Sequence, residues 1–547
     1  MTVSGVNKSI SVDAVKQRRS HPPLCSVRLM PGTAFYEGQQ NMLRYLLVQD
    51  TDSMLYNFRV AAGVPTGGAQ PMTGWDAPEC KLKGHTTGHY LSGLSLAYAV
   101  TGDERLRAKA SALVDGLAEC QTAFAAGGRV HPGFLSAYDE EQFDLLEKLT
   151  KYPEIWAPYY TLDKIMSGLL DAYELADITE ALDILLPLGD WVYERLSRLS
   201  EELRAQMWDT YIAGEYGGMI GTIVRLHRIS GSEKHLEAAM MFENARLFDP
   251  MLAGRDELDN MHANQHIPQI IGAVELYAAT GNAKYLDIAR NFHSIVTGHH
   301  CYSIGGTGDE ERFRAPDSEC GYLTEKTAES CASVNMLRLT SRLFEYEQSA
   351  RSGLMDYYEL TLFNHILMSW SHCADGGTTY FLPLAPGSCK HYETEENSCC
   401  HGTGMESRFR FMADIYSYED DVVRVDLPVS STLDDEEKLS VSFSEDGTFE
   451  ISACADMKRE LAVRIPVWAR DSFPEAEQGY LSFGRLKKDE IVTLRLPVDI
   501  REIPASDSRY YCIARGPYLL ADVSDKGECL KPLFLIDKEC YRVYFNK

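Results

Sequence analysis

The sequence predicts a multidomain α + β protein, with an (α/α)6 barrel first and an antiparallel β-sandwich after it. Three observations predict this fold class. Helical periodicity fills roughly the first 415 residues, a helix–Gly–helix pattern recurs within them, and strand-type alternation begins at Val422. The chain has 547 residues. It is therefore too long for one hydrophobic core, because single cores stop growing near ~250–300 residues.

The helical part repeats one local pattern. Three apolar stretches each run into a hydroxyl residue and a glycine, at Thr101-Gly102, Ser230-Gly231 and Thr280-Gly281. A glycine there suits a helix C-terminal cap, and a second helical stretch follows each one. The repeats are degenerate and their loops are long and unlike, which favours a closed α/α toroid over an open solenoid. The loops hold most of the Gly, His, Trp and Tyr, as expected if they meet at one mouth of a barrel.

Short alternating runs follow Val422, and acidic or Gly-containing turns separate them at 434–437 and 445–447. About 130 residues of such strands make one antiparallel β-sandwich. We place the boundary near Tyr418, which gives a barrel domain at 1–418 and a sandwich domain at 419–547. No low-complexity linker separates the two, so we expect them to pack rigidly. The C-terminal part could also serve as the surface of a homodimer.

Charge and hydropathy exclude several classes of partner. Acidic residues number 80 and basic residues 53, which gives a formal charge of −27. Such a surface repels phosphate backbones and anionic lipid, so we expect no nucleic-acid and no membrane partner. No stretch approaches the ~20 consecutive apolar residues of a spanning helix. The N-terminal stretch 1–20 has no apolar core of the kind a secretory signal carries, and this predicts a cytoplasmic location.

Fourteen cysteines are unusual in such a chain. In a reducing compartment we expect thiols rather than a disulfide framework, and single cysteines such as Cys540 are expected to be small buried apolar residues. Two places differ from this pattern, Cys331 and the adjacent pair Cys399-Cys400.

Residues 305–337 form the densest functional segment, with five glutamates before Cys331 and a helix expected from Glu329 onward. Cys399-Cys400 precede a Gly-rich turn that opens the last barrel helix, and a helix N-terminus lowers the pKa of a thiol. Three thiolates and one carboxylate complete a tetrahedral zinc set of Glu329, Cys331, Cys399 and Cys400. The spacing alone leaves buried thiols without metal as the alternative.

The motifs of this chain, in order, resemble one enzyme family. GWDAPECKLKGHTTGHYLSGLSLAY, YYTLDKIMSGLLDAY, EYGGM, HANQHIP, GGTGDEERF, TAESCASVNML and CCHGTGMES are similar to segments of the β-L-arabinofuranosidase-like enzymes of glycoside hydrolase families 127 and 146. The chain looks closer to family 146, and the resemblance runs from about residue 30 to about residue 520. It implies the same architecture, a catalytic (α/α)6 barrel followed by β-sandwich material.

The resemblance also implies roles for individual residues. It implies a Zn²⁺ site of Glu329, Cys331, Cys399 and Cys400, with Cys399 as nucleophile and Glu311 as general acid/base. Glu310 competes with Glu311 for the acid role, and only the spacing to Phe313 prefers Glu311. The implied activity is that of a retaining exo-glycosidase on a carbohydrate, with β-L-arabinofuranose as the sugar released. We expect the acidic neighbours of Glu311 to raise its pKa, as an acid working near neutral pH requires.

The sugar pocket of the family corresponds to His85, His89 and His262. The chain departs from the family pattern at Asp163, where histidine is usual, and at Ile220-Gly221, where Asn-Glu is usual. All three positions belong to pocket-forming segments, so they bear on the substrate rather than on the reaction. Asp163 is either a sugar contact or a helix-cap or salt-bridge residue.

Two other functions remain open from the sequence. The same toroid hosts metal-free epimerases and hydrolases that use carboxylate or histidine chemistry. A sugar-binding protein with a purely structural zinc would also satisfy the motifs.

Overall fold

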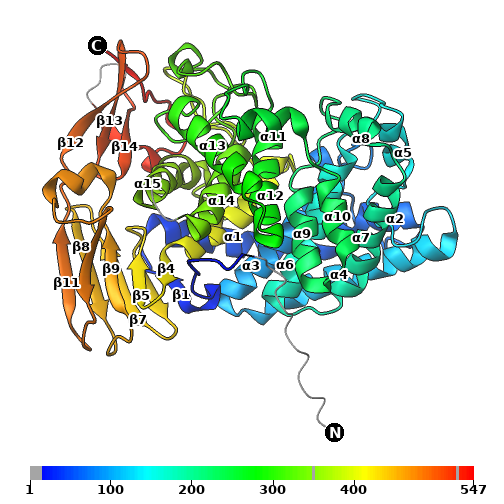
Figure 1. Cartoon of the computed structure of the whole chain (residues 1–547), viewed down its shortest axis with the longest axis horizontal. Coiled ribbons are helices and arrows are strands. Elements are labelled where there is room, and N and C mark those ends of the chain that lie inside the picture. Colours follow the sequence, from blue (N-terminus) through cyan, green and yellow to red (C-terminus); the bar gives the residue numbers. More distant parts are fainter. Residues whose placement is uncertain (1–14, 348–350, 525–528) are drawn as a thin grey trace, which may run out of the picture.

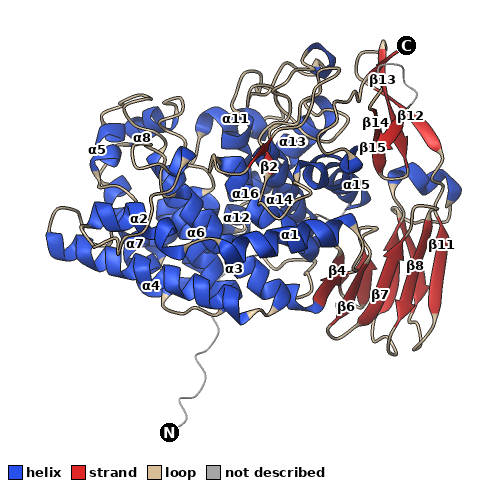
Figure 2. Ribbon diagram, turned by 180° about the vertical axis from the view of Figure 1, so that it is seen from behind, coloured by secondary structure: helices blue, strands red, loops and turns tan. Residues whose placement is uncertain are grey.

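The computed structural model of the chain describes residues 15–347, 351–524 and 529–547. Residues 1–14, which make up most of the N-terminal stretch without an apolar core, lie outside the described residues. A helical body and a strand-rich part lie side by side along the long axis of the molecule (Figure 1). Figure 2 shows the helices gathered in one part and most strands in the other, and most of the helices precede most of the strands in the chain. The predicted fold class is confirmed.

Six inner helices form the wall of the barrel. They are α3 (His85–Thr101), α6 (Pro158–Ala176), α9 (Met219–Ser230), α12 (Ala263–Thr280), α14 (Ser330–Tyr346) and α16 (Cys399–Arg410). Each packs against the next, and α16 returns to α3, which closes the ring. Helix α3 is buried at 14 of its 17 residues, as expected for a helix with no solvent face.

Six outer helices each pack on an inner one. They are α1 (Ala34–Val48), α4 (Glu104–Gly127), α7 (Ala181–Ser197), α10 (Glu233–Met240), α13 (Ala283–His299) and α15 (Arg351–Thr361). Shorter helices fill the connections: α2 (Thr51–Ala62), α5 (Glu141–Glu147), α8 (Glu201–Trp208) and α11 (Ala245–Leu252).

Glycine caps join the inner helices α3, α9 and α12 to the outer helices that follow them. Gly102, Gly231 and Gly281 have φ of 69°, 66° and 69°, in the left-handed region where glycine carries no Cβ penalty. All three predicted caps are confirmed. These turns lie at the C-terminal ends of the inner helices, so the N-terminal ends of these helices meet at the opposite end of the barrel.

Close contact between α3 and α6 depends on two glycines. A Cβ on Gly168 would lie 2.5 Å from the carbonyl oxygen of Gly88, so neither position tolerates a side chain. The two helices therefore approach backbone to backbone. This brings the first turns of α3 and α6 together at one end of the barrel.

Two sheets form the predicted sandwich. One has the order β1-β6-β7-β8-β11 and the other β10-β9-β5-β4. Their strands are β1 (Val27–Leu29), β4 (Tyr416–Glu419), β5 (Val422–Val425), β6 (Ser431–Asp434), β7 (Lys438–Phe443), β8 (Thr448–Ala453), β9 (Glu460–Arg464), β10 (Tyr480–Gly484) and β11 (Ile491–Arg495). Pairing is antiparallel except between β5 and β9. Strand β1 comes from the N-terminal part of the chain, and the boundary near Tyr418 stays a prediction.

The C-terminal residues differ from the prediction of one sandwich. They form a further sheet of β12 (Ile500–Pro504), β13 (Tyr510–Arg515), β14 (Tyr518–Asp522), β15 (Leu530–Pro532) and β16 (Phe545–Asn546). Its apolar side chains pack with Tyr302, Ile304 and Leu382 in a cluster separate from the main core. The alternating patterns are the same in both places, so periodicity alone could not divide the strands between sheets.

The expectation that all cysteines are thiols is wrong at one pair. Cys389 and Cys540 form a disulfide across 151 residues of sequence. The bond joins the C-terminal segment to the loop after Leu384, and the backbones of Ser388 and Tyr541 pair beside it. The other cysteines of the described residues are free.

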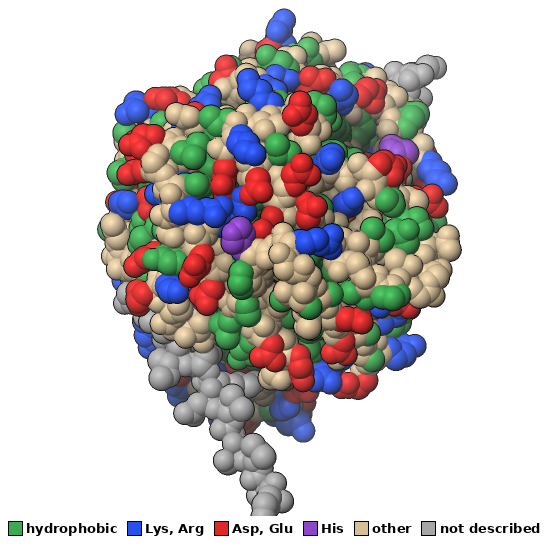
Figure 3. Space-filling view, turned by 90° about the vertical axis from the view of Figure 1, so that its right-hand side faces the viewer, with side chains coloured by type: hydrophobic (Ala, Val, Ile, Leu, Met, Phe, Trp, Pro, Cys, Tyr) green, Lys and Arg blue, Asp and Glu red, His purple; other side chains and the backbone are tan. Residues whose placement is uncertain are grey.

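Buried ion pairs connect the barrel to the sandwich. Arg464 at the end of β9 pairs with Asp356 and Glu359 of α15, and Trp468 donates to Glu359 at 2.7 Å. These contacts agree with the expected rigid packing. On the face shown in Figure 3, acidic and basic side chains are interspersed over the helical end of the molecule. Among the described helices, none has the length and apolarity needed to cross a bilayer.

Candidate functional site

The N-terminal ends of the inner helices converge on one site. His85 is the first residue of α3, Asp163 lies in the second turn of α6, His262 and Glu329 are the N-caps of α12 and α14, and Cys399 is the first residue of α16. Each helix N-terminus carries unpaired N–H groups and the positive end of its dipole, so the site favours anionic side chains.

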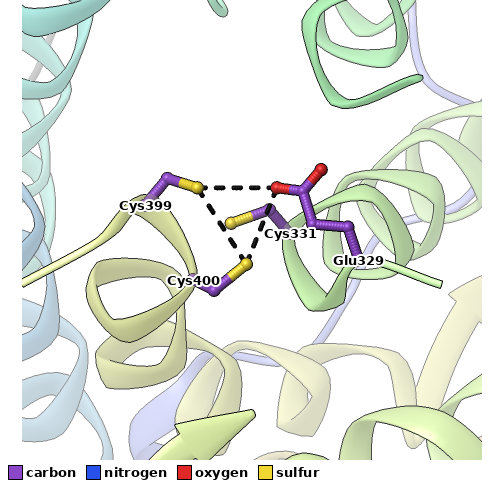
Figure 4. A group of neighbouring side chains, drawn as sticks. All are labelled: Glu329, Cys331, Cys399 and Cys400. Carbon is purple, nitrogen blue, oxygen red and sulfur yellow. Dashed lines mark hydrogen bonds between the residues drawn. The ribbon is translucent and has the colours of Figure 1, made fainter. Parts of the chain in front are cut away.

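Four of the predicted residues form one compact cluster. One ligand atom from each of Glu329, Cys331, Cys399 and Cys400 lies within 4.8 Å of the others. Figure 4 shows the four side chains pointing toward one another, two from the start of α14 and two from the start of α16. Oε1 of Glu329 lies 3.5 Å from Sγ of Cys399 and 3.6 Å from Sγ of Cys400.

One detail of the sequence prediction is wrong at this point. The two cysteines are the first residues of α16 itself, with Ser398 as N-cap, and Gly402 lies inside the helix rather than in a turn before it. A Cβ at Gly402 would collide with the ring of His89. The glycine therefore serves close packing of α16 against α3.

The four acidic groups cannot all ionise together in a buried cluster. Burial raises the pKa of Glu329, and negative charge on Cys399 raises it further. Burial also raises the pKa of the Cys331 thiol, but hydrogen bonds from the thiols of Cys399 and Cys400 outweigh it and lower that pKa to about 7. The pKa values of Cys399 and Cys400 are raised well above their usual range, with Cys331 the largest cause at Cys399 and burial at Cys400. A bound cation would remove this conflict.

The donor set fits a zinc ion. Three sulfurs and one carboxylate are a tetrahedral set for Zn²⁺, and Oε2 of Glu329 is buried without a hydrogen-bond partner. Neighbours hold the ligands in place. Asn264 donates to Oε1 of Glu329 at 3.0 Å, and Thr403 contacts Sγ of Cys331 at 3.2 Å. Such outer contacts orient ligands in metal sites generally.

Glu311 lies beside this cluster, and Tyr380 connects the two. The Tyr380 hydroxyl donates to Oε1 of Glu311 and lies 3.7 Å from Sγ of Cys399. Glu310 instead points outward, with a side chain 57% exposed and an ion pair to Lys326. Both glutamates line a cavity of about 510 Å³, which also has Trp75, Phe381 and His391 in its wall. The contact with Tyr380 therefore distinguishes Glu311 from Glu310, which the sequence pattern alone did not.

The pKa of Glu311 is lowered, which contradicts the expectation that acidic neighbours raise it. Burial raises this pKa, but His262 and Tyr380 outweigh burial. Nε2 of His262 lies 3.5 Å from Oε2 of Glu311, while its Nδ1 lies 3.2 Å from the backbone N of Gln265 at the start of α12. Burial lowers the pKa of His262, and the carboxylates of Glu215 and Glu311 raise it to about 9.

Glu215 is a further carboxylate of the site that the sequence analysis did not single out. Its Oε1 is buried without a hydrogen-bond partner, and its charge acts on His262. Burial raises the pKa of Glu215, His262 lowers it, and Glu311 raises it again. His262 therefore lies in the field of two carboxylates.

His85 and His89 lie together on the first turns of α3, with ring centroids 6.2 Å apart. Burial lowers the pKa of His85, but Asp76 raises it to a net upward shift. Burial lowers the pKa of His89 to about 4, although Glu406 accepts from its Nδ1 at 2.7 Å. Nε2 of each ring is buried without a partner, so both rings have one nitrogen free for a ligand.

Asp163 is buried and fully engaged within the protein. It accepts hydrogen bonds from the Gly218 N–H at 3.0 Å and from the Thr222 hydroxyl at 2.6 Å, and pairs with Lys164. Gly217 has φ 55°, and the turn that contains it lies against Asp163. Asp163 therefore stabilises the turn that follows Glu215. Ile220 packs on Gly272 of α12. Direct contact of Asp163 with a sugar stays a prediction.

Tyr380 and Glu215 were not singled out by the sequence analysis, and only Glu215 carries a sequence signal. Tyr380 follows a two-residue strand in TTYFLPL, where nothing marks it as functional. Glu215 lies in EYGGM, one of the segments that carry the resemblance, and its position before a Gly-Gly turn was the available signal. Trp75, Tyr160 and Tyr380 pack on the three cysteines, whereas Tyr159 lies in the core against Phe143.

A comparison with protein families shows to which family the chain belongs. The model described as "Beta-L-arabinofuranosidase, GH127 catalytic domain" matches residues 26–412. The chain belongs to this family. As a GH127 member it is a glycoside hydrolase, and its helical barrel is the catalytic domain. The closer resemblance to family 146 stays a prediction. No curated protein matches the sequence.

Solved structures show the same fold at low sequence identity. A GH127 β-arabinofuranosidase superposes with a TM-score of 0.70 and 18% identity over 92% of this chain and 85% of its own. A GH127 β-L-arabinofuranosidase from Geobacillus stearothermophilus T6 gives 0.66 and 17% over 91% and 87%. A third structure, a glycoside hydrolase, gives 0.67 and 14% over 94% and 85%.

Proposed function

We propose that this GH127 protein is a retaining exo-β-L-arabinofuranosidase in which Cys399 is the nucleophile and Glu311 the general acid/base. One observation carries the proposal. The hydroxyl of Tyr380 contacts both Sγ of Cys399 and the carboxylate of Glu311, so the two groups face one small volume. A retaining glycosidase needs its nucleophile and its acid at such close range, on opposite faces of the anomeric carbon.

The four-donor cluster supports a zinc enzyme. Glu329, Cys331, Cys399 and Cys400 would hold Zn²⁺ through three sulfurs and one oxygen. When bound, the ion supplies the positive charge that lets these acidic groups remain deprotonated. Asn264 and Thr403 would keep Glu329 and Cys331 oriented toward it.

The reaction then divides between two side chains. In the first step Sγ of Cys399 forms a bond to the anomeric carbon, the bond to the leaving oxygen breaks, and the proton of Glu311 passes to that oxygen. In the second step Glu311 accepts a proton from water as the water attacks the anomeric carbon. The carbon–sulfur bond breaks, and Cys399 returns to its thiolate. Tyr380 holds Glu311 in place between the two steps.

The sugar pocket would be built from residues with free polar atoms. Nε2 of His85, Nε2 of His89 and Oε1 of Glu215 are buried without partners, and each could bind a sugar hydroxyl. Trp75 and Tyr160 lie beside Cys399 and offer flat faces to a ring. β-L-arabinofuranose as the sugar is supported by the family of the chain and by the similar β-L-arabinofuranosidase from Geobacillus stearothermophilus T6. The cytoplasmic location, the homodimer and the lack of nucleic-acid partners stay predictions.

Mass spectrometry of the Glu311→Gln variant tests this proposal. With a nitrophenyl arabinofuranoside the leaving group needs no protonation, so the first step proceeds while the second stalls. We expect an adduct of one sugar that maps to Cys399, and azide should release it. Cys399→Ser should block the first step for every leaving group. An adduct on a carboxylate, or ordinary turnover by Cys399→Ser, would instead support a metal-free barrel enzyme.

Two outcomes address the remaining alternative and the choice of sugar. A protein that keeps zinc but never forms an adduct and turns over no furanoside or pyranoside would be a sugar-binding protein. Turnover of a pyranoside in preference to the arabinofuranoside would keep the mechanism and change the sugar.

A further inference from the structure

A second cavity lies inside the barrel at the end away from Cys399. Its volume is about 340 Å³, and most of its wall comes from α6, α9, α12, α14 and α16, largely from their C-terminal halves. Five arginines face it: Arg225, Arg228, Arg338, Arg342 and Arg410. The catalytic groups proposed above do not reach this cavity.

Four of these arginines are neutralised by carboxylates. Glu275 pairs with Arg228 and with Arg342, which also pairs with Glu345. The other two share Asp171, which pairs with Arg225 at 2.8 Å and with Arg410 at 3.4 Å, and Arg410 also pairs with Glu406 at 2.8 Å.

Each carboxylate that lines the cavity is likewise occupied. Glu174 pairs with Arg225, and Asp414 accepts from Ser341 and Tyr358. His21 lies between Glu345 and Asp414, and despite burial these carboxylates raise its pKa to about 9, so it adds a further positive charge.

Arg338 is the exception. Within the described ranges, no carboxylate oxygen lies within 4.0 Å of its guanidinium. Its hydrogen bond is a long one of 3.4 Å to Oδ1 of Asn335, one turn earlier on the same helix. Arg338 also lies in the middle of α14, between Ser330 and Tyr346, so it gains nothing from the negative end of the helix dipole.

Arg338 is half-buried in the wall of the cavity. Its guanidinium carries five N–H donors, and the single long contact with Asn335 leaves most of them without an acceptor in the protein. Burial and the charge of Arg410 lower the pKa of Arg338, while the more distant carboxylates of Glu406, Asp163 and Asp171 act in the opposite direction. The missing partner would have to be negative, small enough for the cavity, and able to accept several N–H groups.

We propose that this cavity binds a small oxyanion, with Arg338 as the group that holds it. Phosphate, sulfate and carboxylate groups all match the planar fork of a guanidinium, which presents two parallel N–H donors. The site is independent of the proposed catalytic function, since none of its charged side chains takes part in that mechanism.

A chain of amides connects the oxyanion site to the catalytic end. Nη1 of Arg338 contacts Oδ1 of Asn335, Nδ2 of Asn335 donates to Asn264 at 2.9 Å, and Asn264 donates to Glu329 at 3.0 Å. An anion that pulls the guanidinium away from Asn335 would free one acceptor in this chain. The oxyanion site is therefore in contact with the residues that orient Glu329.

Thermal unfolding in matched buffers tests the proposal. Protein as purified is compared in sodium phosphate and in sodium chloride at equal ionic strength, across a series of phosphate concentrations. We expect phosphate to raise Tm by about 1–2 °C in a saturable way, because a ligand that binds only the folded state stabilises it. Arg338→Met should abolish the increase, and in chloride it should be no less stable than the parent. Arg105→Met, at an exposed arginine of α4, is the matched control and should keep the increase.

Two results of this experiment would overturn the proposal. Equal Tm values for the parent protein in phosphate and chloride, with acetate and sulfate equally without effect, would overturn the proposal. So would an increase of the same size in Arg338→Met. An increase with acetate but not phosphate would support the site with a carboxylate as its ligand. If Arg338→Met does not fold, calorimetric titration of the parent protein decides: saturable phosphate binding that Arg338→Lys weakens by tenfold or more supports the site, and no binding heat rejects it.

Discussion

The carboxylate of Glu311 lies 3.5 Å from Nε2 of His262, and Tyr380 donates to its other oxygen. Both neighbours favour the ionised form, so the pKa of Glu311 is lowered although burial acts in the opposite direction. Glu311 must protonate the leaving oxygen, yet before substrate enters its two neighbours stabilise its ionised form. Substrate that covers Glu311 adds desolvation and shifts the balance toward the acid.

This relationship predicts the direction of a pH shift. Replacing His262 by Gln, or Tyr380 by Phe, removes one cause of the lowered pKa, so the pKa of Glu311 should rise. The first step needs protonated Glu311, and its rate falls as pH rises through that pKa. The alkaline limb of kcat/KM for a substrate with a poor leaving group should therefore move to higher pH in both variants.

Two controls test whether the pH shift comes from Glu311. Glu310→Gln, at the exposed neighbour, should leave the pH profile in place, because Glu310 pairs with Lys326 and not with Glu311. An activated nitrophenyl substrate should show no movement of the alkaline limb in any variant, since its departure needs no acid. A limb that moves to lower pH in His262→Gln would contradict the assignment.

Local patterns predicted much of the fold and the metal donors. Gly102, Gly231 and Gly281 cap helices because a positive φ next to an apolar helical stretch is a property of a few adjacent residues. The cluster of Glu329 with three cysteines could be proposed because its motifs resemble those of a known family, whereas the spacing alone left buried thiols as an alternative. In the structure one ligand atom of each of the four residues lies within 4.8 Å of the others, which confirms the predicted cluster.

Other features depend on residues that are distant in sequence. Cys389 and Cys540 pair because the C-terminal segment crosses the loop after Leu384, which no spacing reveals. The pKa of Glu311 was expected to rise from its acidic neighbours in sequence, whereas His262 and Tyr380 in space lower it. Asp163 interacts with a turn of the next inner helix, so its departure from the family pattern could not be interpreted locally.

The metal cluster predicts a definite composition. Purified protein should carry about one zinc per chain, because three thiolates and one carboxylate form a closed set of four ligands. Cys331→Ser and Glu329→Gln should each lose the metal and lower Tm, since metal binding is linked to folding. Elemental analysis with thermal unfolding measures both effects. Cys454→Ser, an exposed free thiol, should keep metal and stability; an absence of metal from protein handled without chelator would refute the prediction.

Glu215 should act through substrate binding. Its buried Oε1 has no partner in the protein, so a sugar hydroxyl would satisfy it. Glu215→Gln removes the charged acceptor and should raise KM by about tenfold or more, in keeping with ~1.5–3 kcal/mol for a hydrogen bond to a charged group. The smaller change is expected in kcat. Steady-state kinetics with Glu310→Gln as the control checks this, and an unchanged KM would remove Glu215 from the sugar pocket.

The disulfide should stabilise the wall of the cavity beside Glu311. Cys389 lines this cavity, and its bond to Cys540 closes a loop of 151 residues. In the chain-entropy picture such a closure contributes about 5 kcal/mol. Cys389→Ser and Cys540→Ser should each lower Tm, and the double variant should lower it no further. Mass mapping of unreduced peptides should show the Cys389–Cys540 link; two free thiols in protein kept under air would contradict it.

Arg464 gives a prediction for the junction between barrel and sandwich. Its guanidinium is buried between Asp356 and Glu359 of α15, and burial already raises the pKa of Glu359 although Arg464 lowers it. Arg464→Met leaves both carboxylates without this partner, which should cost about 3–5 kcal/mol. The loss should shrink as pH falls through the raised pKa of Glu359, because the protonated carboxyl no longer needs a cation.

Replacing the two carboxylates by neutral side chains separates the effect of charge from the effect of packing. Combining Arg464→Met with Asp356→Asn and Glu359→Gln removes the unpaired charges and should restore most of the stability at neutral pH. Arg485→Met is the matched control, since Arg485 pairs with Asp421 on the exposed surface and should change Tm little. If the triple variant is as unstable as Arg464→Met at every pH, the ion pairs are not what holds the two parts together.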